Sequence, residues 1–331
     1  MKILLLRFSS LGDIILTMPV AKALMQVTPK ASVDLGTKSE YSNLFTHPSP
    51  FKNIIYLDDA GVVPFIKKIN EQNYDIIVDL HRSIRTLAIL PLLKASIKKG
   101  YKKGTIARRI FVKTGIKLSN FPGVVERYLN TLNITEIPEP PWFTFDEEER
   151  KIGRSILIKA GIYKDRIIGI APGAKWRTKK WPLRHYVTLA QKLQNKPYDI
   201  AFIFGKGDEQ DLKELLKMYP EARILTTEEH GLRNIAYAIA LMDVFISSDT
   251  GLMHLAEASG IPLVAMFGPT TKEFGFFPVS KKAVVIEKPL ACRPCSLHGA
   301  DKCKYEHHRC MEDITVEEVE DTVIKLLTQK K

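Results

Sequence analysis

Short apolar segments alternate with longer segments of helical spacing along most of this 331-residue sequence, and the alternation limits its possible folds more than any other feature. Lys2–Arg7 is an apolar segment of strand length, and apolar residues recur at helical spacing in Ile14–Val27. Strands that are joined by helices pair in parallel and bury both faces of their sheet. The sequence therefore predicts an α/β fold. Further strands are expected at residues 32–35, 54–57, 75–80, 97–101, 166–171, 199–204, 223–225, 243–247 and 262–267.

A proline-rich segment at residues 134–146 interrupts the alternation. Its three prolines, Pro138, Pro140 and Pro141, remove amide donors and exclude helix, which favours a linker. This predicts one Rossmann-like domain at residues 1–145 and a second at residues 146–315. Residues 316–331 are expected to form a terminal helix that could pack back towards the N-terminal domain. Ligands of such sheets bind at the carboxyl ends of the strands, so a cleft between the domains is the expected site.

The charged residues are unevenly distributed. The formal net charge is +12, and residues 80–125 contain eleven Lys or Arg residues but neither Asp nor Glu. Each of these cations alone is most simply a solvated surface residue, but a continuous block of one sign repels itself. A nucleic acid, an anionic membrane or a phosphorylated substrate could each be its partner.

Secreted and membrane-spanning classes are not expected. The first apolar run ends at Arg7, and no later run approaches the roughly 18 apolar residues of a spanning helix. All four cysteines lie between residues 292 and 310, which excludes a disulfide framework for the whole chain. We therefore expect a cytoplasmic protein.

The turn after the first strand, Arg7–Asp13, is the first candidate site. Gly12 is its only glycine, so the Gly-x-Gly-x-x-Gly pattern of dinucleotide-binding proteins is missing. Asp13 lies at the start of the following helix, where a carboxylate can either face a ligand or cap the helix. From spacing alone, capping is the simpler interpretation.

Two later segments place small and polar residues directly after a predicted strand. Residues 171–182 contain a Pro-Gly turn and then four cations, a composition that can bind phosphate. In residues 247–254, Thr250, Gly251 and Leu252 would begin a helix with free amides at the positive end of its dipole. Glu209, which follows another strand, could accept ribose hydroxyls or be an ordinary first-turn acid.

The four cysteines, Cys292, Cys295, Cys303 and Cys310, form a local cluster in the sequence. In a cytosolic protein such a cluster favours a metal site over disulfides. A structural zinc and free thiols packed in a loop both fit the sequence.

Four motifs together resemble glycosyltransferase family 9, which contains the ADP-heptose:lipopolysaccharide heptosyltransferases. They occur in the family's order and cover about residues 1–325. A similar cysteine-rich segment occurs in many members. The motifs are Leu11-Gly12-Asp13, Lys179-Lys180-Trp181-Pro182, Asp249-Thr250-Gly251-Leu252-Met253-His254 and Phe267-Gly268-Pro269-Thr270.

The resemblance implies a GT-B fold, in which two Rossmann-like domains have parallel sheets that face a central cleft. It implies that Asp13 is the general base. The acceptor is expected at Ser10 and Gly12 of the same turn, and at Arg82 and Arg85 of the basic block. The donor-binding residues that the family pattern implies are Lys179, Glu209, Asp249, Thr250, Gly251, Leu252 and His254.

The resemblance also implies a reaction. It is an inverting, metal-independent transfer of heptose from ADP-heptose to the inner core of lipopolysaccharide, on a lipid A–Kdo or heptosyl acceptor. No cofactor is expected to be required for catalysis, and the acceptor would bring the enzyme to the cytoplasmic face of the inner membrane as a peripheral protein. Nucleic acid is not an expected partner. Two alternatives stay open: a GT-B enzyme with another nucleotide sugar, and a non-catalytic basic protein that binds nucleic acid.

Overall fold

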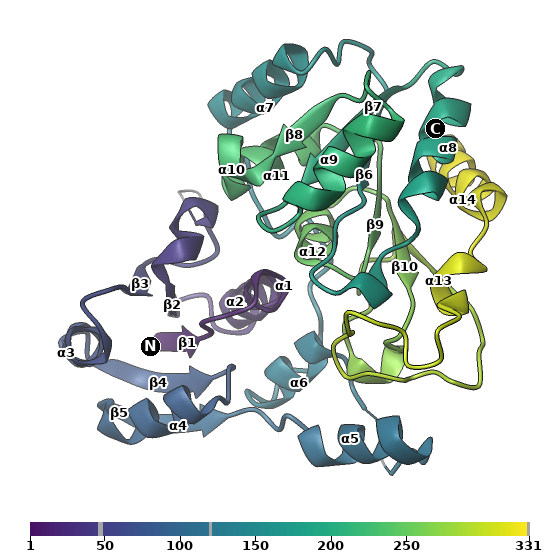
Figure 1. Ribbon diagram of the computed structural model, residues 1–331. Helices are drawn as coiled ribbons and strands as arrows, with labels where there is room; N and C mark the ends of the chain where they lie inside the picture. Colours follow the sequence, from purple (N-terminus) through teal and green to yellow (C-terminus); the bar gives the residue numbers. More distant parts are fainter. Residues whose placement is uncertain (46–48, 119–120, 330–331) are drawn as a thin grey trace. The chain divides into compact units, whose positions relative to one another are not determined.

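Two parallel β-sheets, one in each half of the sequence, organise the computed structural model of the chain, which describes residues 1–45, 49–118 and 121–329 (Figure 1). The first unit comprises Met1–Gly104 and Pro122–Thr144, and the second comprises Thr105–Phe121 and Phe145–Lys331. All strand pairs between the described residues are parallel, as the alternation of strands and helices predicts. The predicted α/β class is thereby confirmed.

The first unit contains a sheet with the strand order β3-β2-β1-β4-β5 among its described residues. Leu6 at the end of β1 pairs with Gly36 of β2 and with Asp79 of β4, so the turns after these three strands are neighbours. Side chains of β1, α3 and α4, among them Leu6, Phe65 and Ile89, form the core on one face. The strands are β1 (Lys2–Leu6), β2 (Ser32–Lys38), β3 (Ile54–Leu57), β4 (Tyr74–Asp79) and β5 (Ala95–Gly100), and the helices are α1 (Leu11–Ile15), α2 (Met18–Val27), η1 (Ser39–Leu44), α3 (Val62–Asn70), α4 (Ile84–Ile89), η2 (Leu90–Leu92) and α6 (Val124–Asn130).

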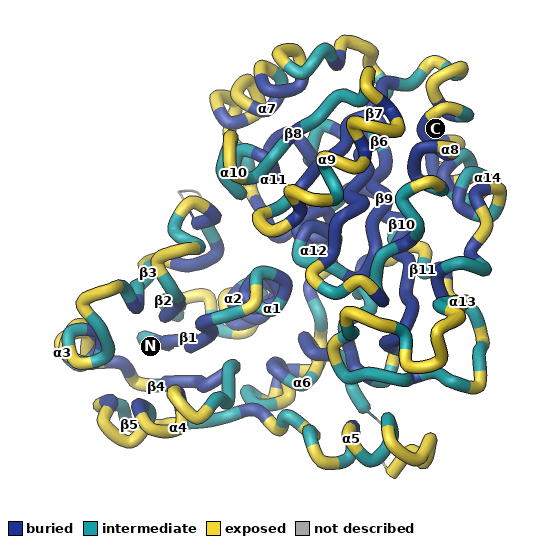
Figure 2. The backbone as a smooth tube through the Cα atoms, in the orientation of Figure 1, coloured by how far each residue is buried: buried dark blue, intermediate teal, exposed yellow. Residues whose placement is uncertain are grey.

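The second unit contains a sheet with the order β11-β10-β9-β6-β7-β8 among its described residues. Every residue of β6, β7, β9 and β10 is buried, which is why these strands are almost continuously apolar (Figure 2). The strands are β6 (Ile167–Ala171), β7 (Asp199–Phe204), β8 (Ile224–Thr226), β9 (Val244–Ser248), β10 (Leu263–Phe267) and β11 (Ala283–Glu287). The helices are α5 (Thr105–Thr114), α7 (Glu147–Lys159), η3 (Arg177–Lys179), α8 (Leu183–Gln194), α9 (Glu209–Met218), α10 (Thr227–His230), α11 (Leu232–Ala240), α12 (Gly251–Ala258), η4 (Lys272–Phe274), α13 (Arg309–Glu312) and α14 (Val316–Thr328).

Three features differ from the expected organisation. Residues 105–121 belong to the second unit, because the ring of Phe111 packs on Phe274 at 6.4 Å and Lys117 pairs with Glu273 at 3.5 Å. Helix α14 does not form a separate segment: its apolar side, with Val323 and Leu326, is part of the core of the second unit, beside α8, β9 and β10. The edge strand β11 is not among the predicted strands. Within the described residues, no helix has the length and hydrophobicity that crossing a membrane would require.

Candidate active site

Asp13 lies in the first turn of α1, and both oxygens of its carboxylate have partners in the first unit. Oδ2 accepts hydrogen bonds from the backbone amide of Ser10 at 3.1 Å and from its hydroxyl at 2.9 Å. Oδ1 forms an ion pair with Nη2 of Arg7 at 2.7 Å, and both side chains are largely buried. Ser10 is thus the N-cap residue of α1, and Asp13 is the third helical residue, whose Oδ2 accepts from the N-cap amide, whereas Oδ1 belongs to a charged pair.

Arg7 connects the ends of β1 and β4 to this turn. Its guanidinium donates to the carbonyls of Ser9 at 2.7 Å and Leu80 at 2.5 Å in addition to pairing with Asp13. Burial alone would raise the pKa of the Asp13 carboxyl. The Arg7 charge and the hydrogen bonds from Ser10 and Arg7 outweigh burial and hold that pKa below its ordinary value. The carboxylate is consequently ionised at neutral pH and can accept a proton.

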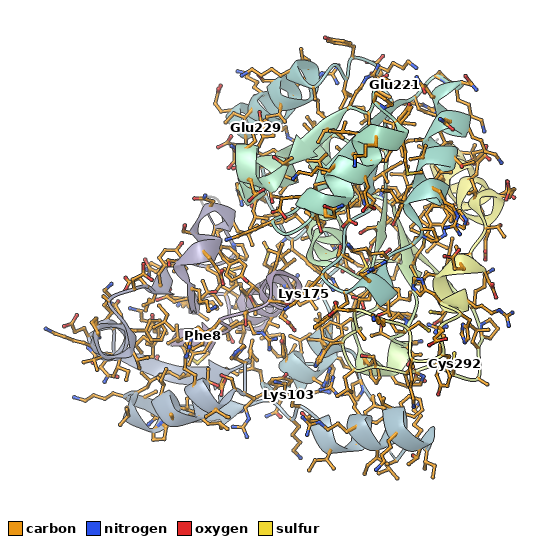
Figure 3. All side chains as sticks on the ribbon, in the orientation of Figure 1. Phe8, Lys103, Lys175, Glu221, Glu229 and Cys292 are labelled. Carbon is orange, nitrogen blue, oxygen red and sulfur yellow. The ribbon has the colours of Figure 1, made fainter. Side chains whose placement is uncertain are left out.

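His81 and Tyr128 are close electrostatic neighbours that the sequence analysis did not identify. Burial, and then the charges of Arg7 and Lys103, lower the pKa of His81 to about 4, so its imidazole is neutral at physiological pH. The ring packs against Phe8, which is labelled in Figure 3, with centroids 5.7 Å apart. Tyr128 is completely buried, and its electrostatic interactions with Arg7 and Asp13 mark it as part of the same turn environment. A usable signal for His81 is its position two residues after the end of β4.

The two arginines that we predicted for the acceptor lie just beyond β4. Arg82 adopts a left-handed backbone conformation, with φ of 50°, and its amide donates to Asp79 Oδ1 at 2.8 Å. Its side chain covers Gly100 of β5, since a Cβ at Gly100 would lie 2.9 Å from Arg82 Cδ. Arg85 is exposed on α4. Their acceptor role, like those of Ser10 and of the buried Gly12, stays a prediction.

In the second unit, the structure brings three of the sequence motifs together. Nζ of Lys179 forms an ion pair with Asp249 Oδ2 at 2.6 Å, and the Thr270 hydroxyl donates to the same oxygen at 3.0 Å. The carboxylate is buried, so Lys179 is held directly before α12. Thr250 caps this helix by accepting a hydrogen bond from the amide of Met253 at 3.2 Å. A cation and a helix N-terminus at one place favour a phosphate ligand.

His254 and Glu209, which we predicted to bind the donor, both have contacts within the second unit, and their donor-binding roles stay predictions. His254 is buried and its Nδ1 lies 3.2 Å from Glu257, whose other oxygen accepts from the amides of Val279 and Ser280. These contacts hold the His254 side chain in the interior of the second unit. Glu209 is exposed and accepts a hydrogen bond from the amide of Gly207 at 2.9 Å.

Asp208, which the sequence analysis passed over, is the buried acid of this turn. It occupies the N-cap of α9, but its carboxylate turns back and accepts from the amide of Gly205 at 2.9 Å. A Cβ at Gly173 would lie 2.2 Å from this carboxyl, which shows how closely the turn after β6 approaches it. Burial raises the pKa of Asp208 to about 6.

The cysteine segment packs against the turn after β10. Arg293 donates to the carbonyls of Gly268 and Thr270 and pairs with Glu287, so it holds the Phe267–Thr270 motif in place. Arg293, which lies inside the Cys-Arg-Pro-Cys segment, supports this motif from outside it. The sequence alone did not indicate this role.

All four thiols are free. Cys292, labelled in Figure 3, has its sulfur 3.9 Å from Nε2 of His307. Burial raises the pKa of Cys310 to about 12, and burial followed by the charges of Cys292 and Cys303 raises that of Cys295. Across residues 1–45, 49–118 and 121–329, no three His, Cys, Asp or Glu side chains converge in a way that could hold a metal ion. A structural zinc at these cysteines stays a prediction.

Comparisons with known proteins agree with these motifs. The family model for glycosyltransferase family 9 (heptosyltransferase) matches residues 62–305. Lipooligosaccharide heptosyltransferase 2 of Haemophilus ducreyi is 26% identical over 99% of both chains. The corresponding protein of Campylobacter jejuni (serotype O:6) is 28% identical over 54% of this chain and 56% of its own length. The solved structure of Escherichia coli ADP-heptose lps heptosyltransferase II is 23% identical, covers 100% of this chain and 99% of its own, and superposes with a TM-score of 0.79.

Proposed function

Since the chain belongs to glycosyltransferase family 9, the heptosyltransferases, we propose that it transfers heptose from ADP-heptose to the inner core of lipopolysaccharide. Family membership makes the chain an enzyme of the GT-B class and removes the non-catalytic nucleic-acid-binding alternative. Two observations support the finer proposal. The Escherichia coli structural relative is named for ADP-heptose, and the full-length Haemophilus relative is named for heptose transfer. The acceptor would be lipid A–Kdo or a heptose already attached to it.

In this proposal Asp13 is the general base of a single displacement. The acceptor hydroxyl attacks the anomeric carbon, its proton passes to the carboxylate of Asp13, and the bond from the anomeric carbon to the diphosphate oxygen breaks. ADP leaves with the electron pair, and attack from the opposite side inverts the anomeric configuration. The lowered pKa of Asp13 keeps the carboxylate ionised at neutral pH, while its pairing with Arg7 makes it a weaker base than an unpaired carboxylate.

The departing diphosphate would be stabilised by Lys179 and by the first turn of α12. The carrying observation is that Lys179, Asp249 and Thr270 converge at the start of this helix. The amides of Gly251 and Leu252 lie in its first turn, where no preceding helical carbonyl is available to accept a hydrogen bond from them. A fixed ammonium and helix amides can stabilise the charge that grows on a leaving phosphate without a metal ion.

Lys179→Ala tests this assignment. Removing the ammonium should weaken ADP binding and lower kcat together, by about 10²-fold in kcat/KM, because the diphosphate charge increases in the transition state. Lys175→Ala is the matched control: Lys175 lies in the same turn but is exposed, and its ammonium stacks over Trp176 at 5.5 Å. Calorimetric titration with ADP and steady-state assays with ADP-heptose give both quantities. Equal effects of the two substitutions would contradict the role of Lys179.

A second candidate is a GT-B enzyme that uses another nucleotide sugar. Competition between ADP and UDP for the second unit separates the two candidate functions. ADP would mimic the leaving group of ADP-heptose, and UDP would mimic that of a UDP-sugar donor. Preferential binding of UDP would favour the second candidate.

A further inference from the structure

The outward side of α4 and η2 is apolar, although a surface helix normally turns polar residues to solvent. The exposed fraction of the residue is 89% for Ile84, 46% for Leu87 and 60% for Leu92. We call this surface the α4 stripe; its exposed members are Ile84, Leu87, Ala88, Pro91 and Leu92.

The stripe is not the side of the helix that forms the core. Thr86 and Ile89 of α4 and Leu93 after η2 are buried, and Ile89 and Leu93 belong to the core of the first unit. In Figure 2 the tube of α4 accordingly alternates between exposed and buried colours. The helix therefore has two apolar sides, of which only one is used in folding. Several exposed apolar side chains on one short surface indicate an interaction site.

Cations surround the stripe. Arg85 is exposed on α4 itself, and Lys94 is exposed two residues after Leu92. Lys98 of β5 reaches the stripe from the neighbouring strand, where its Nζ donates to the carbonyl of Pro91 at 3.2 Å. Residues 80–125, which include all of these, contain no Asp or Glu. The surface thus combines an apolar centre with a positive margin.

We propose that the α4 stripe docks the enzyme on an anionic phospholipid bilayer, with Ile84, Leu87 and Leu92 in the interface and the cations at the headgroups. An apolar side that enters the headgroup region and basic residues that meet anionic lipid are the two requirements of interfacial binding. This inference adds to the proposed function the surface through which the enzyme would reach a lipid-anchored acceptor.

The other occupants fit less well. A nucleic acid supplies phosphate but gives large aliphatic side chains no apolar region to enter. A second copy of the chain would bring the same positive margin against itself. Lys98 and Lys99 also lie on the edge strand β5, where lysines oppose pairing with another strand.

The test uses the full-length protein and vesicles of phosphatidylglycerol and phosphatidylcholine, in sedimentation assays at low and high salt. The variant Ile84→Ser/Leu87→Ser/Leu92→Ser should lower the partition coefficient by about 100-fold at both salt concentrations, because three aliphatic side chains no longer leave water. Val63→Ser is the matched control, since Val63 is 78% exposed on α3 of the same unit but lies outside the stripe. This control should bind like the wild type.

Lys94→Gln/Lys98→Gln examines the margin separately. The loss should be about 30-fold at low salt, from roughly 1 kcal/mol for each lysine near an anionic surface, and should nearly vanish at high salt. Unchanged unfolding midpoints show that the variants are folded, as the exposure of the substituted side chains leads us to expect.

Three outcomes would overturn the inference. The first is wild-type binding by the triple serine variant, and the second is an equal loss in Val63→Ser. The third is displacement of the protein from vesicles by duplex RNA together with weaker RNA binding in the same variants, which would assign the surface to nucleic acid. Vesicle binding requires neither ADP-heptose nor transfer, so failure of the proposed function would leave this result intact, and the reverse also holds.

Discussion

At Asp13 the two carboxylate oxygens have different partners, and this difference joins a local role to a chemical one. Oδ2 accepts from Ser10 and stabilises the first turn of α1, whereas Oδ1 faces the guanidinium of Arg7. A carboxylate with these contacts keeps a fixed orientation, which a general base requires. The contacts of Arg7 with the carbonyls of Ser9 and Leu80 orient the arginine in turn.

Replacing Asp13 by Asn should lower kcat by about 10²–10⁴-fold, because the change keeps the shape of the side chain and removes only its ability to accept a proton. ADP binding should stay close to that of the wild type, since Asp13 lies in the first unit and the proposed diphosphate site in the second. Steady-state kinetics and ADP titration measure the two effects. Normal turnover in Asp13→Asn would leave Asp13 with its capping role alone.

Arg7→Gln should move the acid limb of the pH profile of kcat/KM to higher pH. The Arg7 charge holds the pKa of Asp13 down, and Asp13 works as a base only when it is ionised. Loss of that charge therefore raises the pKa of Asp13 and, with it, the pH at which activity begins. Arg7→Lys keeps a positive charge and should leave the limb nearer its original position. An acid limb that does not respond to Arg7→Gln, or that responds equally to both changes, would show that Arg7 does not set this pKa.

Among the elements, the turn after β6 and the start of α9 depend on each other. The carboxylate of Asp208 occupies the space where a side chain at position 173 would lie, so this position requires glycine for close approach. Asp208 gives up the capping of its own helix and bonds to Gly205 at the end of β7. The contact therefore ties the carboxyl ends of β6 and β7 together.

Gly173→Ala should lower the free energy of unfolding by about 1–3 kcal/mol, because the new methyl group overlaps the Asp208 carboxyl. The cost should be smaller in an Asp208→Ala background, so that the two substitutions are not additive. Gly205→Ala is the control, since its Cβ would lie 3.5 Å from Asp208 Oδ2, an ordinary contact. Urea unfolding of the four proteins and the control gives these energies, and full additivity would rule out the proposed overlap.

For the whole molecule, the proposed transfer needs no metal ion. Activity should persist during brief treatment with excess EDTA, because Lys179 and the amides of α12 are proposed to supply the stabilising charge. Elemental analysis of the purified protein tests the cysteine cluster separately, with the fold followed by circular dichroism. Activity lost with EDTA and restored by magnesium would contradict the mechanism. One zinc per chain would favour a structural zinc at the cysteines over free thiols.

Much of the fold follows from local sequence patterns. Almost continuously apolar strands such as β6 and β7 indicate the interior of a covered sheet, and their alternation with helices predicts parallel pairing. The turns after β1 and β9 could be predicted from the sequence, because in each of them the end of an apolar strand, a small residue and the start of a helix follow one another closely in the chain. The family assignment rests on the same short motifs, and the family comparison confirms it.

Other features depend on contacts between residues far apart in the chain. Asp249 pairs with Lys179 across about 70 residues, and nothing near position 208 in the sequence shows that its carboxyl meets Gly173. The assignment of α5 to the second unit depends on Phe274 and Glu273, and the place of α14 depends on a shared core. Periodicity shows that a helix has an apolar side, but burial depends on which surface the folded chain brings against it. The contacts of the folded chain were therefore needed to show that α4 has one apolar side in the core and another in solvent.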